Sequence, residues 1–265
     1  MGRRIIFNFV AAAVLCAAWA VSAGAQDFRQ SFNLAPGGSI SIKNVSGDIN
    51  ITGYDGATVE VSAYKEGRDR DQVSVENLST AGNVSLRADY AEHCNCDASL
   101  RFEVKVPRSV RFDFEKISTA SGNLSAENVT GRVEMNTASG DVTVSGVSGE
   151  IRASSASGTV KVKESAGNVN ASSASGDVEV ELTRVDGDGD MRFSSASGNV
   201  NVRLPASIDA TVEMSTVSGS IETNLPIEVK HNNYGPGSRA RGQFGGGSRL
   251  LKISSASGDV SLKSI

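Results

Sequence analysis

Short runs of alternating apolar and polar residues fill most of the chain beyond about residue 120. In the segments 142–144 (Val-Thr-Val), 160–162 (Val-Lys-Val) and 178–180 (Val-Glu-Val), every second side chain is apolar. Alternation with a period of two predicts a β-strand with one face buried and one face exposed. The many glycines and β-branched residues disfavour a helix in the same segments. The pattern therefore predicts an all-β fold of many short strands.

Glycines separate these runs at a fixed spacing of nine residues, at Gly122, Gly131, Gly140, Gly149, Gly158, Gly167 and Gly176. Every second glycine ends a motif such as Ser-Ser-Ala-Ser-Gly at 154–158, which returns in similar form at 194–198, 215–219 and 254–258. A short fixed period over this distance is typical of a stacked repeat protein. We expect each glycine to form a corner, because glycine adopts positive φ angles at little cost.

Two kinds of nine-residue unit alternate, so we predict that about 18 residues form one coil with two short strands. Stacking such coils about 4.8 Å apart would place Val142 over Val160 and Val178. The inward hydroxyls of Thr137, Ser155 and Ser173 would then form a column, bonded along the axis or to corner backbone groups, and the narrow interior would hold no ligand. The predicted fold class is an all-β parallel β-solenoid, or β-helix, with an N-terminal β cap.

The regular spacing is lost towards both ends. Eight of the eleven aromatic residues after position 25 lie between Phe28 and Phe114, so we expect 26–115 to form a broader N-terminal β cap continuous with the solenoid. The solenoid repeats would occupy 116–265, with corner insertions near 183–191 and 231–248. The second insertion is glycine-rich, which predicts a solvated loop whose Arg239 and Arg241 could touch an acidic glycan.

Residues 1–25 have the pattern of a signal peptide. Arg3 and Arg4 precede an apolar stretch at 5–21, and Ala-Gly-Ala at 23–25 predicts cleavage after Ala25. The alternative is a retained membrane anchor, although the apolar stretch is short for that role. Lipid attachment at Cys16 is disfavoured because Leu15 stands where a small residue is needed. We therefore expect an exported protein, periplasmic, at the outer surface or secreted, with no transmembrane segment after cleavage.

The charge balance restricts the class of partner. Loss of residues 1–25 would remove two arginines and no acids, which moves the formal charge from −4 to −6. An acidic chain without a basic stripe is poorly suited to nucleic acid. The expected partner is an envelope, matrix or cell-surface component. The final strand, at 259–263, is expected to be an exposed edge that could support end-to-end self-association.

The segment 93–97 (His-Cys-Asn-Cys-Asp) brings together the residue types most suited to redox or metal chemistry. In an exported protein, Cys94 and Cys96 can form a disulfide, although residues two apart on a strand need some kinking to do so. Free or intermolecular thiols and a metal site are the alternatives. The only other histidine is His231, so four zinc ligands are not in evidence.

Asp186, Asp188 and Asp190 alternate with other residues as acids do in calcium loops. Met191 replaces the glycine expected after the third acid, and Ser197 stands where a glutamate would complete the loop. These aspartates are therefore weak metal candidates, and a corner insertion is the simpler interpretation.

Neither the many serines nor the acids that follow corner glycines define a catalytic site. A catalytic serine needs a base, and both histidines lie outside the serine repeats. Asp141, Asp177 and Asp259 could in principle form a polysaccharide-lyase-like site, but such corner residues commonly bond nearby backbone groups instead. We predict no catalytic residue and no cofactor.

Several segments together resemble a known family. They are Ser-Gly-Asp-Ile-Asn-Ile at 46–51, Phe-Glu-Val-Lys-Val-Pro at 102–107, the Ala-Ser-Gly-(Asp/Asn)-Val units, and Gly-Gly-Gly-Ser-Arg-Leu-Leu at 245–251. In this order they resemble the bacterial "putative adhesin" family of β-strand-repeat proteins. The resemblance implies an envelope or surface protein with a β-solenoid fold, and it brings no catalytic residues with it.

The function expected from the sequence is a non-enzymatic, exported, adhesin-like scaffold. Its contact surface would be the outward polar ladder of Ser125, Thr143, Lys161 and Glu179. The first alternative is a carbohydrate-acting β-helix enzyme of polysaccharide-lyase type. The second is an envelope-stress accessory protein that binds a membrane regulator.

Overall fold

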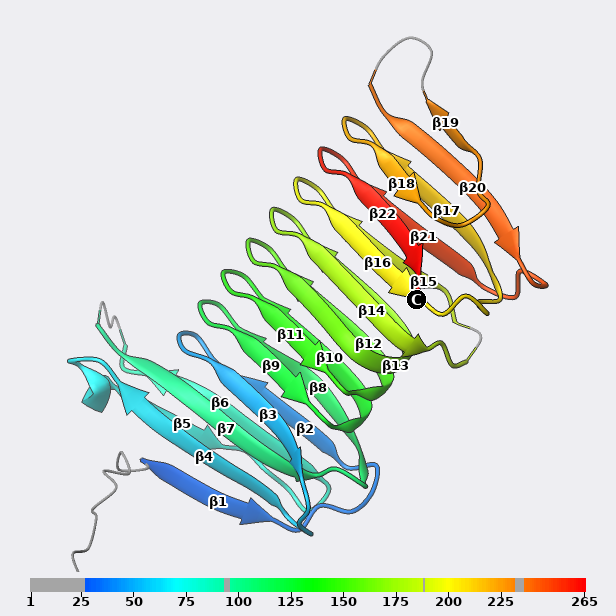
Figure 1. Ribbon diagram of the computed structural model, residues 1–265. Coiled ribbons are helices and arrows are strands. Elements are labelled where there is room, and N and C mark those ends of the chain that lie inside the picture. The colour runs from blue at the N-terminus through cyan, green and yellow to red at the C-terminus, as the bar shows by residue number, and fades with distance from the viewer. Residues whose placement is uncertain (1–26, 93–95, 188, 232–235) are drawn as a thin grey trace, which may run out of the picture.

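The computed structural model describes residues 27–92, 96–187, 189–231 and 236–265. These residues form 22 β-strands and one short 3-10 turn, η1 (Arg70–Gln72), and all strands belong to one hydrogen-bonded sheet. The sheet is wound into a stack of coils (Figure 1). The all-β prediction is confirmed, and the fold is β-solenoid-like. The proposed signal peptide and its cleavage site after Ala25 lie outside the described residues.

Each coil contributes one strand to each of two faces of the stack. The first face contains, in spatial order, β5 (Val73–Asn77), β6 (Asn83–Tyr90), β2 (Ser39–Lys43), β8 (Arg111–Thr119), β10 (Thr130–Thr137), β12 (Ser148–Ser155), the second half of β13 (Val160–Ser173), β15 (Met191–Ser195), β21 (Leu250–Ser255), β17 (Ala210–Thr216), β20 (Ser238–Phe244) and β19 (Val229–His231).

The second face contains, in the same direction, β1 (Phe28–Phe32), β4 (Val59–Glu66), β7 (Ser99–Pro107), β3 (Ile49–Tyr54), β9 (Leu124–Glu127), β11 (Val142–Ser145), the first half of β13, β14 (Val178–Arg184), β16 (Val200–Leu204), β22 (Val260–Ser264) and β18 (Ile221–Thr223).

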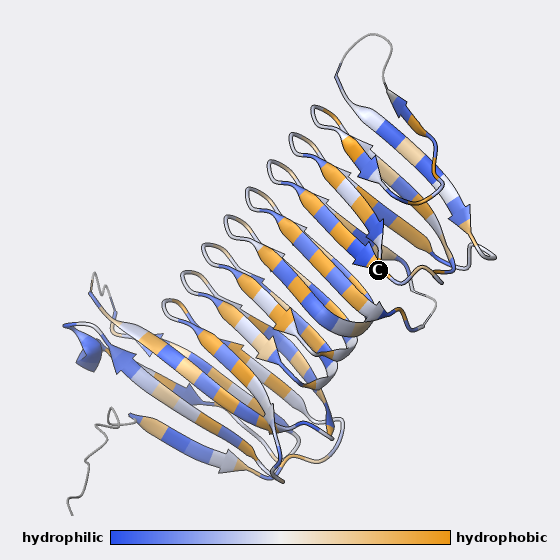
Figure 2. Cartoon of the chain, in the orientation of Figure 1, coloured by the Kyte–Doolittle hydropathy of each residue, from blue (hydrophilic) through white to orange (hydrophobic). Residues whose placement is uncertain are grey.

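The central coils follow the predicted register. Val142 pairs in parallel with Val160, and Val160 pairs with Val178, so equivalent residues are 18 positions apart. Alternate side chains point into the narrow space between the faces, and Figure 2 shows the resulting apolar and polar banding along each strand. Val142, Val144 and Ile151 are fully buried there. Larger side chains, including Phe102, fill the N-terminal part, as its aromatic content suggested.

The reason for glycine differs between the two halves of the repeat: Gly131, Gly149 and Gly167 have positive φ of 136°, 145° and 127°, as expected, whereas the glycines of the Ser-Gly corner do not. Gly140, Gly158 and Gly176 are not among the residues with positive φ. A Cβ atom on Gly158 would instead lie 2.0 Å from the carbonyl oxygen of Gly140 in the preceding coil. Close approach of stacked backbones therefore requires glycine at this corner. At the second corner the left-handed conformation falls on Asn128, Gly146 and Glu164, with φ of 54°, 63° and 49°.

The predicted hydroxyl column is present at the glycine corner. The buried Ser155 hydroxyl donates to the carbonyl oxygen of Gly140 (2.7 Å) and accepts the N–H of Gly158 (2.8 Å). Ser173 repeats both bonds one coil later, with Gly158 and Gly176. Each hydroxyl thus joins the corner of its own coil to that of its neighbour, which satisfies backbone groups that no strand pairing reaches.

The coils do not stack in chain order at either end. The first coil, β2 and β3, lies between β6–β7 and β8–β9. The last coil, β21 and β22, lies between β15–β16 and β17–β18. The expectation that the final strand is an exposed edge is therefore wrong, because β22 is paired on both sides.

Antiparallel strands occur at both ends of the stack, although β18, the last strand of the second face, pairs in parallel with β22. At one end, β1 and β4 run antiparallel to their neighbours, as does β5. At the other end, β20 pairs antiparallel with β17 and β19. Residues 238–244, expected to be a flexible loop, are thus a strand. Antiparallel end strands interrupt the repeating edge that further copies of the coil could otherwise extend.

Candidate interaction surfaces

The outward ladder proposed from the sequence lies on the second face. Ser125, Thr143, Lys161 and Glu179 occupy directly paired positions on β9, β11, β13 and β14. Lys161 forms an ion pair with Glu179 at 2.9 Å. The charged half of this ladder is therefore internally neutralised, which leaves little net attraction for a charged partner.

A groove of about 670 Å³ lies at the far end of the first face, across β17, β19, β20 and β21. We call it the C-terminal groove. Its charged lining residues are Glu213, Glu228, Lys230, Arg239, Arg241 and Lys252. The lining thus carries four basic and two acidic residues, although the whole chain has a formal charge of −4.

The cations of the C-terminal groove are mostly unpaired. Arg241 lies 3.6 Å from Glu213, opposite it in the β17–β20 pairing. Among the described residues, Lys230, Arg239 and Lys252 form no ion pair within 4.0 Å, although Lys252 stands opposite Glu213 in the β17–β21 pairing. The groove therefore presents a local positive potential to solvent, to which a polyanion would be attracted. Of its residues, sequence analysis had selected only Arg239 and Arg241.

The aspartates of the first insertion are engaged in local contacts. Asp186 accepts two bonds from Arg184, at 2.6 and 2.8 Å, and these bonds hold the pKa of its carboxyl below the ordinary value. Asp190 accepts the N–H of Leu250 at 2.8 Å, and Asp188 lies outside the described residues. Within the described part of the chain, no group of three or more His, Cys, Asp or Glu could hold a metal. The metal hypothesis stays a prediction without a supporting contact.

Three corner loops that are distant in sequence meet at the second corner. Thr183 and Arg184 end β14 and Val185 follows it, Pro205 and Ser207–Asp209 precede β17, and Arg249 precedes β21. Together these residues line a cavity of about 190 Å³. Arg249 is only 9% exposed, and its Nε and Nη1 have no hydrogen-bond partner among the described residues. Each such buried donor costs about 1–3 kcal/mol. Sequence analysis missed Arg249, because only the fold brings these loops together.

The acids that follow the corner glycines bond the backbone of the adjacent coil. Asp141 Oδ1 accepts the N–H of Thr159 at 2.8 Å, and Asp177 Oδ1 accepts that of Asn199 at 2.7 Å. Asp259 accepts both the N–H and the hydroxyl of Ser220, which lowers the pKa of its carboxyl. These residues act as rungs between coils, as the simpler interpretation of the sequence expected.

The cysteine cluster is only partly described. Cys96 is half-buried, packs against the core and is disulfide-bonded. Cys94 and His93 lie outside the described residues, so the pairing of Cys94 with Cys96 stays a prediction.

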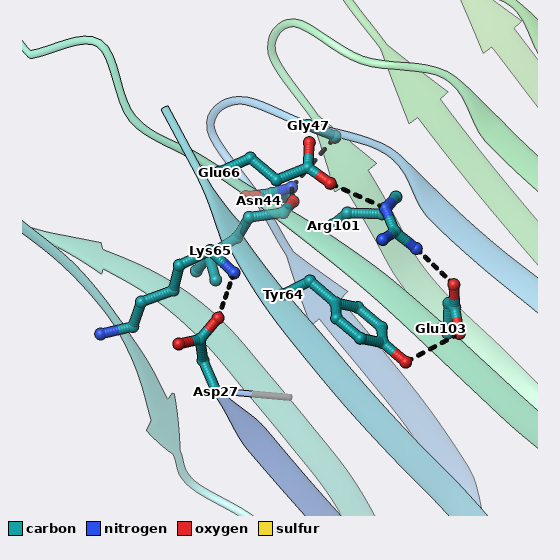
Figure 3. A network of polar contacts seen from close by, with 9 residues as sticks. Asp27, Asn44, Gly47, Tyr64, Lys65, Glu66, Arg101 and Glu103 are labelled. Atoms are coloured by element: carbon teal, nitrogen blue, oxygen red, sulfur yellow. Dashed lines mark hydrogen bonds and ion pairs between the residues drawn. The ribbon is translucent and has the colours of Figure 1, made fainter. Parts of the chain in front are cut away.

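A polar network joins β4 and β7 near the N-terminal end (Figure 3). Arg101 bonds Glu66 at 2.9 Å and also contacts Glu103, and its guanidinium lies 4.4 Å from the centre of the Tyr64 ring. Tyr64 donates to Glu103 at 3.3 Å. The bond to Glu66 is the main reason that the pKa of Arg101 is raised. Because Arg101 of β7 binds Glu66 of β4 and Tyr64 of β4 binds Glu103 of β7, the network stabilises the β4–β7 pairing.

Within the described ranges, there is no helical segment with the length and hydrophobicity needed to cross a bilayer.

Comparison with known proteins gives a family and several remote structural likenesses. A family model described as Toastrack DUF4097 matches residues 38–263. A "putative cell adhesion protein" from Clostridium sporogenes is 12% identical, with 90% of this chain and 99% of that one covered and a TM-score of 0.40. A "putative adhesin" from Bacteroides fragilis is 12% identical, with 90% and 96% covered and a TM-score of 0.39. One from Parabacteroides distasonis is 13% identical, with the same coverage and a TM-score of 0.37. No curated protein matches the sequence.

Proposed function

Starting from the fact that the chain belongs to the Toastrack DUF4097 family, we propose that it is an exported, non-enzymatic, adhesin-like scaffold. In this proposal, the stack of coils presents the C-terminal groove to an acidic polysaccharide of the envelope, the matrix or a cell surface. The family assignment agrees with the resemblance found in the sequence. Export is supported by the signal-like pattern of residues 1–25.

The observation that carries the proposal is the group of unpaired cations in the C-terminal groove. Lys230 and Arg239 are exposed and directly paired across β19 and β20, and Lys252 is half-exposed on β21, which β17 separates from β20. Their positions across the end of the first face match a ligand with several negative charges along an extended chain. Attraction of this kind depends on charge and weakens as salt screens it.

The enzymatic alternative receives no comparable support. The candidate acids Asp141, Asp177 and Asp259 each accept backbone hydrogen bonds from the next coil. The buried hydroxyls of Ser155 and Ser173 are likewise bonded to corner glycines. In both groups the functional atoms take part in holding the coils together, and we assign them a structural role.

The experiment that tests the proposal is binding of the purified protein to immobilised acidic and neutral polysaccharides. We expect retention on polymers rich in carboxylate or sulfate groups and none on neutral polymers of similar length. The double variant Arg239→Glu/Lys252→Glu should reduce affinity by about tenfold or more, which corresponds to ~1.4 kcal/mol.

The matched control is Lys43→Glu/Lys105→Glu, which changes the net charge equally at exposed positions far from the groove. Equal loss in both double variants would mean that only overall charge matters, and the groove would then have no specific role. Retention on neutral polymers alone would exclude the acidic ligand. Hydrolysis or elimination of any of the polymers would contradict the non-enzymatic assignment.

A further inference from the structure

The cavity at the second corner is lined by Arg249, whose Nε and Nη1 have no hydrogen-bond partner among the described residues. Arg249 is nine-tenths buried. A buried guanidinium with unmet N–H groups is rare in folded proteins and usually indicates a missing acceptor. The acceptor has to be a group that is not part of the described chain.

The nearby carboxylates do not fill that role, because other donors hold them. Asp186 is bound at both oxygens by Arg184. Asp209 Oδ1 accepts the N–H groups of Gly247 at 2.7 Å and Ser248 at 3.3 Å. These backbone bonds lower the pKa of Asp209, and the charge of Arg249 contributes to the lowered pKa of Asp186. Asp209, which lines the cavity, is thus bonded through Oδ1 to the loop backbone, and Asp186 acts on Arg249 through its charge without a hydrogen bond to it.

The size of the cavity limits the missing group. A volume of about 190 Å³ exceeds the ~30 Å³ share of one water molecule several-fold. It is large enough for a group with a few oxygens. Ser207 and Thr183 add hydroxyls to its lining, and hydroxyls together with a guanidinium are suited to an oxyanion.

We propose that the Arg249 cavity binds a small oxyanion, a carboxylate, sulfate or phosphate group, between the three corner loops. The anion accepts hydrogen bonds from Arg249 Nε and Nη1. Because the lining comes from the end of β14 and from the loops before β17 and before β21, occupancy ties together coils that are not consecutive in the chain. This site is separate from the C-terminal groove and does not depend on the function proposed for it.

Binding can be measured by isothermal titration calorimetry of the purified full chain in chloride buffer at constant ionic strength. The probes are sodium sulfate, sodium phosphate, sodium acetate and sodium glucuronate. We expect saturable binding to the wild type, and at least tenfold weaker binding to Arg249→Met. Arg203→Met is the control, since Arg203 is exposed and pairs with Glu181 outside the cavity.

The probes also separate the sources of the anion. Binding of sulfate, phosphate or acetate indicates that a free anion suffices, whereas binding of glucuronate alone indicates an acid group carried by a larger ligand. No saturable binding of any probe to the wild type would overturn the proposal. Undiminished binding to Arg249→Met would also overturn it.

A second measurement covers the case in which Arg249→Met does not fold. In the wild type, titration with the best probe should shift the side-chain Nε–H resonance of Arg249 in a ¹H–¹⁵N spectrum, with the same saturation curve as the calorimetry. The Nε–H resonance of Arg203 should stay in place. Equal shifts at both arginines would show a general salt effect and would contradict a site at Arg249. The groove variant Arg239→Glu/Lys252→Glu should bind the probes as the wild type does.

Discussion

The substitution Gly158→Ala tests the packing of the coil corners. The added Cβ would lie 2.0 Å from the carbonyl oxygen of Gly140 and 2.7 Å from Oδ1 of Asp141. Both atoms belong to the preceding coil, and the nearer one is backbone, which cannot rotate out of the way. The two corners must therefore separate by at least 1 Å to reach the 3.0 Å below which real Cβ contacts are essentially absent.

The expected cost follows from the hydrogen bonds that such a separation breaks. Between these two coils, Ser155 Oγ bonds Gly140 at 2.7 Å, Thr159 N–H bonds Asp141 at 2.8 Å, and Ser157 N–H bonds Ala138 at 3.1 Å. An opening of 1 Å takes all three beyond hydrogen-bonding distance. At about 1 kcal/mol each, their loss destabilises the protein by roughly 3 kcal/mol, which is within the usual range for overpacked sites.

Urea unfolding followed by far-ultraviolet circular dichroism measures this effect, with stability taken from linear extrapolation. The control is Gly82→Ala, since a Cβ at Gly82 would have no neighbour within 4 Å and its φ is not positive. That change should be neutral or stabilise by about 0.4–1 kcal/mol. If Gly158→Ala unfolded at the same urea concentration as Gly82→Ala, close packing would not be the reason for the glycine repeat.

Two further predictions concern the bonds between coils. Ser155→Ala should lower the free energy of unfolding by about 1–3 kcal/mol in the same urea assay, because it removes the partner of Gly158 N–H and of the Gly140 carbonyl. The control Ser154→Ala, at an outward-facing position, should lower it clearly less. Equal losses in the two variants would contradict a structural role for the hydroxyl column. The bonds to Ser220 lower the pKa of Asp259 in the folded protein. The ionised carboxyl therefore stabilises the fold above the unfolded-state pKa of about 4, and this stabilisation is lost as the pH falls through the lower folded-state pKa. The difference in urea midpoint between the wild type and Asp259→Asn should therefore shrink on acidification. A difference that stays constant from pH 7 to pH 2 would contradict this role of the Asp259 carboxylate.

The central coils could be predicted from the sequence because their determinants are local. Period-two alternation defines which side chains are inward, and an 18-residue repeat places Val142 over Val160 in any stack of equal coils. The backbone bonds of Ser155 followed from its inward position at a corner. The conformational reason for the glycines was wrong at Gly158, since contact with another coil, and not φ, excludes the side chain.

The order of the end coils could not be predicted, because similar coils have similar edges. The strand β22 has the same alternation as β16 and β18, between which it is inserted, so its pattern fits several positions in the stack. The strand β20 was not predicted, because the glycines and polar side chains of its segment are typical of a loop. Both groups of candidate residues, in the C-terminal groove and around Arg249, come from segments that this non-sequential order brings together.

Binding of acidic polysaccharide to the cations of the C-terminal groove is tested by the affinity of the wild type and Arg239→Glu/Lys252→Glu for one acidic polymer, measured by surface plasmon resonance over a range of salt concentrations. We expect the wild-type affinity to fall steadily with salt and the variant to bind at least about tenfold more weakly at low salt. Affinity that is independent of salt and equal in the two proteins would contradict binding through these cations.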